Sequence, residues 1–583
     1  MHSQAVLLAV VLVQRRDVFR RTCVGHVAAS ADDRPGVASA VGVRRAFAAG
    51  EAGRGRQVAQ DLGGLVDGFG SVDFGGEATL DAMKASLALG ALLAVACAAS
   101  SCAESDPEGE GGSPSAQGSQ SVTSSTKSTS ASPSSTSSGD GGNGGNGGDG
   151  GNGGNACVGA AWSESFGDAM GQYPSGLAVD GSNNVFLSGL YEGTMDFGGG
   201  ALPNPNGYSI FLAKRDANGA HVWAKSLGDA GLGGRGTVLA TDTAGNVYVT
   251  GDHGGTVDLG GGALFDSAYI GKLDPTGAHV WSKSFLGEPW GIAIDGVGDI
   301  VMIGRFLGTL DLGGGPIVSQ GLGDVFVAKL TGAGDHVWSY GYGDENLQVG
   351  AALAIDSADN VVVSAFGSGS IDFGGGPLTS THGRLLMAKL DPMGGHIWSK
   401  QFGDDGSTIG LAMATDASDN VVVAGNFDAT VDFGGGPLVS TAPQQQQNDD
   451  IFVAKLDSAG DHVWSQTFGA DGFQSVLSLK VGAQGSITMT GRAEVGVDFG
   501  GGTLTAASAL EDAFVAVLAA DGTHVWSRLF GDVGSDVGAD VALDTADHII
   551  VSGVYEGGNV DLGCGPLPAS QDTDIFLGAL TAP

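Results

Sequence analysis

A unit that recurs from residue 157 to the end of the chain constrains the fold more than any other feature of the sequence. Each copy carries one Trp of a regular series, and these Trp residues are 57 to 66 residues apart. A period of this length is typical of an array, a solenoid or a propeller. The series is Trp162, Trp223, Trp281, Trp338, Trp398, Trp464 and Trp526. A second motif, Asp-(Phe/Leu)-Gly-Gly-Gly, begins at Asp196, Asp258, Asp311, Asp372, Asp432 and Asp498, and returns as Asp-Leu-Gly-Cys-Gly at Asp561.

Each period holds four short runs that have the composition of β-strands. In the unit after Trp338 they are Ala351–Asp356, Asn360–Ser364, Leu385–Leu390 and His396–Phe402. Short β-branched or aromatic runs bounded by Gly, Asp and Asn indicate strands and hairpins. The period of two predicts that His396, Trp398, Lys400 and Phe402 share one face. We expect the Trp and Phe side chains to fill the space between neighbouring sheets.

The two ends of the repeat region predict a closed ring. The first Trp strand, Ala161–Phe166, has no preceding partner strands, and the last unit ends at Asp574–Leu580 without a Trp strand. The N-terminal strand would then be the outer strand of the last sheet, which leaves no unpaired seam. We therefore predict an all-β, seven-bladed β-propeller of four-stranded antiparallel blades. An open solenoid with a spare strand at each end is the alternative.

The repeat resembles a known family. Its fullest form is Asp-x-x-x-Asn-Val-x-Val-x-Gly, then Asp-x-Phe-Val-Ala-Lys-Leu-Asp, then His-Val-Trp-Ser-Lys-x-Phe-Gly. These motifs resemble the bacterial β-propeller repeats called SBBP, and the resemblance covers residues 157–583. It implies a propeller in a secreted or surface protein. It implies no shared activity and no catalytic residues.

The first 82 residues differ from the rest of the chain. They hold as many Arg as acidic residues, and their apolar run Ala5–Val13 is too short to span a bilayer. Met83 opens a better secretory start, because Lys84 is followed by the apolar run Leu87–Ala96. We expect translation to begin at Met83 and residues 1–82 to be a disordered extension added by a gene-start error. A real, poorly ordered extension is the alternative.

Residues 83–102 are predicted to be a signal peptide with a lipobox-like end. Small residues precede both Cys97 and Cys102. Cleavage before Cys102 discards Cys97 and leaves Cys157 and Cys564 as a pair, whereas cleavage before Cys97 leaves an odd thiol. Cys102 is therefore the expected lipidation site and Cys97 the alternative. We expect an outer-membrane or cell-surface lipoprotein, or else a secreted protein without lipid.

Residues 103–156 are predicted to be a disordered linker. Ser and Thr dominate its first half and Gly and Asn its second, so it has too little apolar surface to offset its ordering entropy. The propeller then fills residues 157–583. A disulfide between Cys157 and Cys564 would join the two ends of the ring. Antiparallel pairing places Cys157 at the opposite end of the blade from the connection that holds Cys564, so the bond requires this connection to fold back.

The formal net charge of −38 bears on the partners of the chain. A chain this acidic repels nucleic acid and anionic lipid surfaces, and it attracts cations or cationic partners. Solubility is the simpler explanation of the charge. We expect a monomer that contacts a membrane only through a lipid anchor.

The recurring polar residues are better explained by structure than by chemistry. The turns from Asp180, Asp242, Asp356 and Asp416 to the Asn four residues later predict self-capping; a calcium site is the alternative. The glycine motif is followed by no helix and no Lys-Ser/Thr pair, so we predict positive-φ turns or close backbone approach rather than a phosphate loop. The His two residues before each Trp and the Lys of the Ala-Lys-Leu strands are interpreted as structural. We align Val517 and Gly578 with this Lys in the last two blades.

A single active site requires residues that break the repeat. The departures are Trp290, Arg235, Arg305, Arg492, Glu345, the insertion Gln444–Gln447 and the loss of the Asp-Asn turn near Val481–Ser486. No nucleophile–base pair can be identified among them, so we assign no catalytic, cofactor or metal residues. The long connections and inter-blade loops are expected on one face, where a binding site is favoured.

The sequence therefore favours a non-enzymatic, membrane-tethered propeller that presents loops to a protein or glycan partner. A secreted propeller enzyme that acts on glycans and a calcium-dependent adhesin are the alternatives. A passive surface scaffold without a defined pocket is a further one.

Overall fold

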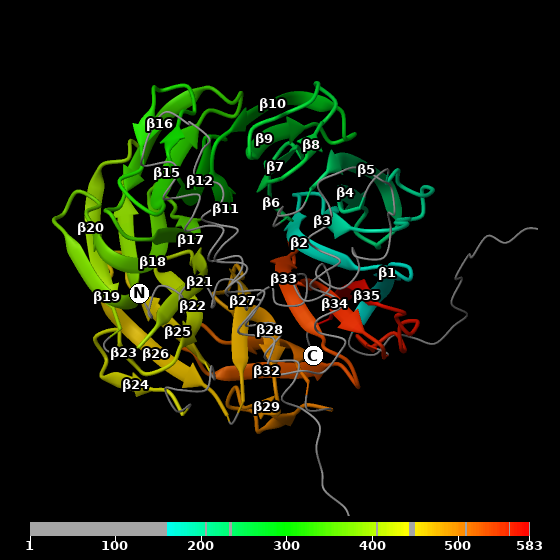
Figure 1. The fold of residues 1–583 in the computed structure, drawn as a ribbon. Helices are drawn as coiled ribbons and strands as arrows, with labels where there is room; N and C mark the ends of the chain where they lie inside the picture. Colours follow the sequence, from blue (N-terminus) through cyan, green and yellow to red (C-terminus); the bar gives the residue numbers. More distant parts are fainter. Residues whose placement is uncertain are drawn as a thin grey trace, which may run out of the picture. The chain divides into compact units, whose positions relative to one another are not determined.

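The computed structural model describes residues 160–581 apart from 205–206, 232–235, 404–405, 442–448, 471, 508–509 and 559. Within these ranges every regular element is a β-strand. None of the described segments forms an apolar helix of the length that a bilayer crossing requires. The strands build seven sheets of at least four antiparallel strands, arranged around a common axis as the blades of a propeller (Figure 1).

Each of the first four blades begins with its innermost strand. Blade 1 contains β2 (Gln172–Val179), β3 (Val185–Tyr191), β4 (Ser209–Arg215) and β5 (His221–Asp229). Blade 2 contains β6 (Gly236–Thr241), β7 (Val247–Asp252), β9 (Ala268–Leu273) and β10 (His279–Phe285). Blade 3 contains β11 (Glu288–Ile294), β12 (Ile300–Phe306), β15 (Asp324–Leu330) and β16 (His336–Tyr342). Blade 4 contains β17 (Gln348–Ile355), β18 (Val361–Ile371), β19 (Leu378–Leu390) and β20 (His396–Phe402).

The remaining blades follow the same order. Blade 5 contains β21 (Thr408–Thr415), β22 (Val421–Phe427), β25 (Asp450–Leu456) and β26 (His462–Phe468). Blade 6 contains β27 (Gln474–Val481), β28 (Ile487–Ala493), β31 (Asp512–Leu518) and β32 (His524–Phe530). Blade 7 contains β33 (Val537–Leu543), β34 (Ile549–Glu556), β35 (Thr573–Leu580) and β1 (Ala160–Phe166). The connections between second and third strands add β8 (Thr256–Val257), β13 (Thr309–Leu310), β14 (Ile317–Val318), β23 (Thr430–Asp432), β24 (Pro437–Val439), β29 (Gly496–Val497) and β30 (Leu504–Thr505).

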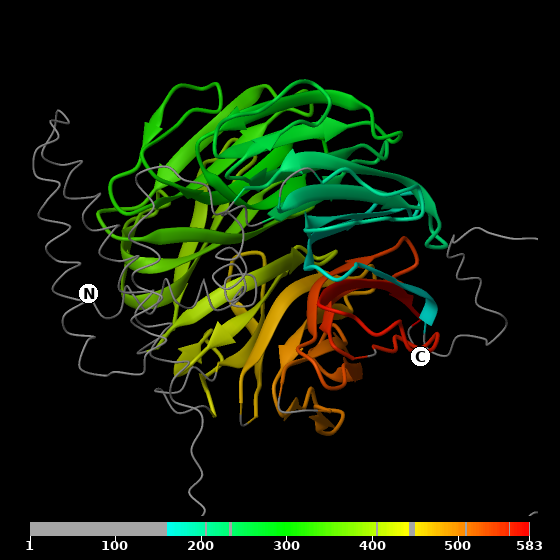
Figure 2. The ribbon, with the colours of Figure 1, turned by 45° about the vertical axis from the view of Figure 1, so that its right-hand side comes forward.

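The ring is closed by the N-terminal strand, as the sequence predicts. Strand β1 pairs antiparallel with β35, from Ala160 opposite Leu580 to Phe166 opposite Ile575. Figures 1 and 2 both show β1, in cyan, beside the red strands at the end of the chain. The first strands of neighbouring blades contact one another in the order β2, β6, β11, β17, β21, β27, β33 and back to β2. The ring therefore has no open seam.

The core lies between the blades, where the sequence places the aromatic side chains. One apolar cluster joins Trp398 and Phe402 of blade 4 to Phe433 and Phe452 of blade 5. The ring of Phe433 lies 4.9 Å from that of Phe402 and 5.1 Å from that of Phe452. Phe433 belongs to an Asp-Phe-Gly-Gly-Gly motif, so this motif supplies an apolar wedge between neighbouring blades.

Each glycine of the motif has its own structural reason, as blade 4 shows. The Asp372 carboxylate accepts the N–H groups of Gly374 (2.7 Å) and Gly376 (2.9 Å), and both residues have φ near +105°. A Cβ on the middle residue, Gly375, would lie 2.4 Å from the ring of His396. The positive-φ turn and the close approach that the sequence predicts are both confirmed.

A β-bulge in each outer strand changes the predicted pattern of faces. In β20, Trp398 pairs with Lys389 and His396 with Leu390, so Ile397 has no partner residue. The bulge moves His396 to the other face, where its Nε2 lies 3.1 Å from Ser399 Oγ. The prediction that His396 and Trp398 share a face is therefore wrong, because the period of two does not continue through a bulge.

The connections divide between two faces. The face with the tight turns between first and second and between third and fourth strands is called the short-turn face here. The other, the loop-rich face, carries the inter-blade loops and both ends of each second-to-third connection. The middle of that connection folds back over the outer edge of the blade, since the glycine motif meets the first residue of the outer strand. In blade 7 the same fold brings Cys564 into an apolar cluster with Ala160.

Candidate functional site

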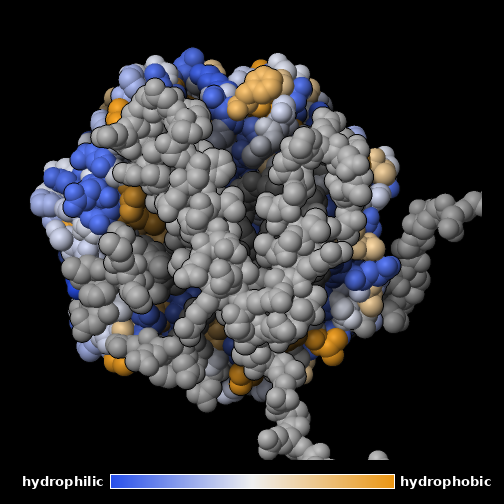
Figure 3. Space-filling view, in the orientation of Figure 1, coloured by the Kyte–Doolittle hydropathy of each residue, from blue (hydrophilic) through white to orange (hydrophobic). Residues whose placement is uncertain are grey.

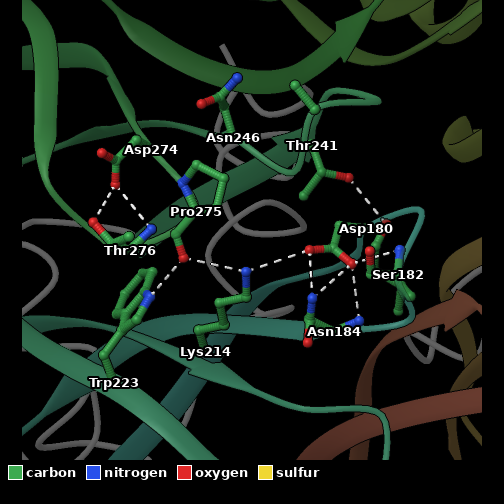
Figure 4. Close-up of polar contacts among 12 residues, drawn as sticks. Asp180, Ser182, Asn184, Lys214, Trp223, Thr241, Asn246, Asp274, Pro275 and Thr276 are labelled. Atoms are coloured by element: carbon green, nitrogen blue, oxygen red, sulfur yellow. Dashed lines mark hydrogen bonds and ion pairs between the residues drawn. The ribbon is translucent and has the colours of Figure 1, made fainter.

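On the short-turn face, a buried polar cluster ties blade 1 to blade 2 (Figure 4). In blade 1 the Asp180 carboxylate accepts the backbone N–H groups of its own turn and both side-chain N–H bonds of Asn184. Lys214 Nζ lies 3.4 Å from Asp180 Oδ2 and donates to the carbonyl of Pro275 in blade 2 at 3.3 Å. Trp223 Nε1 donates to the same carbonyl at 3.2 Å. The cluster is a structural contact between two blades.

The Lys–Asp pair recurs in the first five blades. Its further members, with Nζ–Oδ2 distances, are Lys272–Asp242 (3.2 Å), Lys329–Asp295 (2.6 Å), Lys389–Asp356 (2.7 Å) and Lys455–Asp416 (2.8 Å). Burial raises the pKa of Asp416, but hydrogen bonds from Asn420 and Lys455 outweigh it and lower that pKa to about 2. Both oxygens of the Asp416 carboxylate are therefore engaged within the fold.

The Lys–Asp pair is absent from the last two blades, where other residues take its positions. In blade 6, Val517 replaces the Lys, and Gly482 stands at the turn position of the Asp. In blade 7, the register of β34 with β35 places Ala579 at the Lys position, so the alignment of Gly578 with this Lys is wrong by one residue. Asp544 keeps a partner there, because His548 Nδ1 lies 2.8 Å from its Oδ2. No charged group is left alone when its partner is lost, as buried charges require.

The Asp-Asn turns are therefore self-capped, as predicted. Asp356 Oδ1 accepts the N–H groups of Ala358 and Asn360, both at 2.9 Å, and the other Asp-Asn turns repeat this pattern. In the ranges that the structure describes, no three His, Cys, Asp or Glu side chains converge as a metal site would require. The calcium alternative stays a prediction.

The loop-rich face exposes large apolar side chains at the ends of its connections. Leu286, Leu307 and Leu322 lie at this end of blade 3, and Leu307 is 65% exposed. They share one end of the blade because Glu288 pairs with Arg305, and Phe306 with Asp324. Val495, Leu510 and Val533 form a second exposed set at blades 6 and 7. Figure 3 shows separate orange areas among blue ones on the side of the molecule seen in Figure 1.

The residues that break the repeat lie mostly at this loop-rich end. Arg305 pairs with Glu288, and Arg492 Nη1 lies 2.8 Å from Glu511 Oε2. The Arg492 guanidinium also lies 4.9 Å from the centre of the Phe473 ring. Trp290 is half-buried at the bulge of β11, and it packs on a cluster of apolar side chains from blades 4 and 5. Glu345 is exposed, whereas Arg235 and Gln444–Gln447 lie outside the described residues.

Carboxyl groups also collect where one blade meets the next on the loop-rich face. At the junction of blades 3 and 4, Asp324 is buried with Asp344 and Gln348 near it. Asp324 Oδ2 accepts the N–H of Gln320 at 2.8 Å, and its Oδ1 has no hydrogen-bond partner among the described residues. Burial and the Asp344 charge raise the pKa of Asp324. Blades 6 and 7 meet at a similar junction, which holds Asp512, Asp532 and Asp536.

The sequence analysis did not identify Asp540, which joins three blades at the central axis. It lies on β33, where Oδ2 accepts the N–H of Leu177 in blade 1 (2.9 Å) and Oδ1 accepts the hydroxyl of Ser478 in blade 6 (2.6 Å). The matching first-strand positions hold small residues, such as Gly176 and Ala352. An acidic residue at a position where other blades hold a small residue was the sequence signal that could have identified Asp540.

The cysteines assigned from the sequence are mostly beyond the described ranges. Cys97, Cys102 and Cys157 lie outside them, so lipidation stays a prediction. Cys564 forms a disulfide bond, and its partner is not among the described residues. The pairing with Cys157 also stays a prediction.

Comparisons with known proteins leave the function of the chain open. No protein-family model matches the chain. It is similar to the "Uncharacterized WD repeat-containing protein L264" of Acanthamoeba polyphaga mimivirus, with 23% identity over 276 residues, 40% of this chain and 19% of that protein. The chain thus spans about a fifth of the length of this curated relative.

The chain also resembles several solved structures at low sequence identity. The β-propeller domain of the Trilobed protease from Pyrococcus furiosus has 8% identity and a TM-score of 0.35, covering 66% of this chain and 89% of that one. A polysaccharide lyase of family PL25, an ulvan lyase, has 12% identity and a TM-score of 0.38, covering 68% and 93%. The Neurospora crassa Pan2 WD40 domain has 10% identity and a TM-score of 0.32, covering 70% and 89%. These similarities carry no argument about activity or ligand.

Proposed function

We propose that this chain is a non-enzymatic binding propeller that presents its loop-rich face to a protein or glycan partner. The observation that carries the proposal is the contrast between the two faces. On the short-turn face the recurring charges are engaged within the fold. Lys389 pairs with Asp356 in its own blade, and it donates to Ser458 O of the next blade. On the loop-rich face, Leu286, Leu307 and Leu322 are exposed together at one end of blade 3. Exposed apolar groups that lie together mark interaction sites.

The proposed location is the cell surface or the periplasm. The signal-like segment 83–102, with Cys102 as the expected lipidated residue and Cys97 as the alternative, supports a membrane tether. The resemblance of the repeat to SBBP propellers supports the same location. The propeller would then be held to the membrane through the linker and the lipid anchor. Its negative charge would disfavour nucleic acid as a partner.

The test compares binding by three forms of the full chain. The first is the wild type, and the second carries Leu286→Ser, Leu307→Ser and Leu322→Ser. The third carries Val297→Ser and Met393→Ser, which are exposed turn residues of the short-turn face. Each form is applied to a glycan array and to an array of cell-surface proteins. We expect the blade 3 variant to lose at least about tenfold in affinity for any partner found, and the control to keep it.

Equal binding by all three forms would contradict the proposed face. The array also separates the alternatives. Cleavage of an arrayed glycan would favour the enzyme, for which an accessible carboxylate pair is needed. Binding that disappears with a chelator and returns with calcium would favour the adhesin, as would a calcium-dependent rise in melting temperature.

A further inference from the structure

At the junction of blades 6 and 7, a hydrogen-bond acceptor replaces a donor. The corresponding position at the junction of blades 3 and 4 is Gln348, whose Nε2 donates to Asp344 Oδ1 and to Ser368 O, both at 2.6 Å. At the junction of blades 7 and 1, Gln172 makes the same two bonds. Asp536 takes this position between blades 6 and 7. A carboxylate has no N–H, so neither bond can form there.

The loop around Asp536 nevertheless keeps the geometry of the Gln junctions. Asp536 Oδ2 accepts the N–H of Asp532 at 3.2 Å, as the Gln348 side-chain oxygen accepts the N–H of Asp344 at the same distance. Asp536 Oδ1 accepts the N–H of Glu556 at 3.3 Å. The side chain has changed from an amide to an acid that is one methylene shorter, while its acceptor contact with the loop is kept.

A second buried carboxyl group faces Asp536. Asp512 and Asp536 are each 1% exposed. Asp512 Oδ2 accepts the N–H of Ala507 at 2.9 Å, while its Oδ1 has no hydrogen-bond partner among the described residues. A Cβ on Gly531 would lie 2.7 Å from Asp512 Oδ1 and 2.5 Å from Asp536 Oδ2. The two oxygens therefore border one small space above Gly531.

Two carboxylates cannot both be charged in such a place without a large cost in free energy. One proton removes this cost, because a protonated oxygen donates to the other carboxylate. We propose that Asp512 and Asp536 share one proton, and that this proton is a pH-sensitive latch between blades 6 and 7. The latch stabilises the contact between blades 6 and 7 when the proton is present, and this contact is weakened when the proton leaves.

The titration of the pair agrees with this geometry. Burial, together with the charges of Asp512 and Asp532, raises the pKa of Asp536 to about 7. Burial also raises the pKa of Asp512, and the Asp532 charge adds to the effect. The pair therefore loses its proton near neutral pH rather than in acid.

Several charged or titratable groups belong to the elements packed around the pair. The inter-blade loop contributes Asp532, and the end of β34 contributes Tyr555 and Glu556. Tyr555 donates its hydroxyl hydrogen to the carbonyl of Pro568 at 2.8 Å.

A second group lies around Glu511, which precedes β31. Its carboxylate pairs with Arg492 of β28 and accepts the hydroxyl of Ser535. Arg492 is the one cation among the described residues named here, and it is engaged by Glu511. Asp574 adds a further negative charge near Tyr555.

The sign of the pH dependence follows from the raised pKa. The folded chain holds a proton that the unfolded chain releases, so the latch contributes its full stability below the ordinary carboxyl pKa of 3.8. This contribution declines as the pH rises toward about 7 and is lost above it. Other buried carboxyl groups act in the same direction, so the test must compare variants at each pH.

The test measures urea midpoints of the full chain from pH 5 to pH 8.5 for the wild type, Asp536→Gln and Asp512→Asn. Asp536→Gln restores the residue that stands at this position between blades 3 and 4 and between blades 7 and 1. We expect its midpoint to rise relative to the wild type as the pH increases, with about one proton fewer in the pH dependence of unfolding. Asp512→Asn supplies a permanent donor and should act in the same way. A midpoint difference that is the same at pH 5 and pH 8.5 would overturn the proposal.

A reciprocal variant and a local measurement complete the test. Gln348→Asp creates an acid pair with Asp324, and it should introduce the same pH dependence at the junction of blades 3 and 4. Hydrogen exchange of the Asp532 and Glu556 amides, corrected for intrinsic rate, should accelerate in the wild type above neutral pH. The Asp344 amide is the internal control. Equal changes at both junctions would contradict a latch specific to blades 6 and 7.

Discussion

At the residue scale, single side chains hold neighbouring blades together. Trp398 is 9% exposed, packs in the cluster between blades 4 and 5, and donates its Nε1 hydrogen to Ser458 O of blade 5 at 3.1 Å. The sequence predicts the apolar role of the Trp series from its periodicity. It does not predict the acceptor carbonyl, because this lies one whole period further along the chain.

The first prediction concerns this contact. Trp398→Ala should lower the free energy of unfolding by about 3–5 kcal/mol, because it removes a buried ring and leaves a cavity between two blades. The measurement is urea unfolding of the full chain. The neighbouring variant Ile397→Ala is the matched control, since Ile397 stands in the bulge and is 45% exposed, and it should change stability by no more than about 0.5 kcal/mol. Similar effects of the two substitutions would show that the blade packing is described wrongly.

At the scale of strands and turns, the polar cluster around the Ser458 carbonyl is built from three separate elements. The turn before β18 supplies Asp356, β19 supplies Lys389, and the next blade supplies Ser458 O, which lies 3.2 Å from Lys389 Nζ. A period of two places Lys389 on one face of its strand. Only the packing of the next blade decides that this face is buried, so the sequence could identify the Lys as recurrent but not as paired.

The second prediction is a double-mutant cycle that copies blade 6 into blade 4. Lys389→Val alone should cost about 3–5 kcal/mol, because it leaves the buried Asp356 carboxylate without its cation. The combined variant Lys389→Val with Asp356→Gly reproduces Val517 and Gly482, and it should recover a large part of this loss. The midpoints of urea unfolding give both values. If the two losses simply add, the residues do not act as a pair.

At the scale of the whole molecule, stability depends on how the ring closes. Strand β1 completes blade 7, and Asp540 joins β33 to the first strands of blades 1 and 6. At this seam the repeat itself changes. Ala160 stands at the position of the recurrent His. Cys564 stands at the position of the middle glycine, where in the other blades the His ring leaves no room for a side chain. The smaller Ala leaves room for the Cys side chain.

The third prediction is that Cys157 is the disulfide partner of Cys564. Two residues lie between Cys157 and the start of β1, whose first residue shares a cluster with Cys564. Peptide mapping of the unreduced protein should recover the two cysteines in one linked species. Cys564→Ser should then lower stability by about 2–4 kcal/mol under oxidising conditions and leave the reduced protein little changed. Two free thiols at these positions would contradict the pairing.

The sequence by itself determined the repeat, the strand order within each blade, the number of blades and the closing strand. These follow from local periodicity and turn chemistry, which act over a few residues and are repeated often enough to remove ambiguity. The tertiary structure decided the bulge at Ile397, the fold of each glycine connection over the blade edge, and the meeting of Asp512 with Asp536. Each of these depends on contacts between segments that are distant in sequence, and a one-dimensional pattern carries no information on which buried groups face each other.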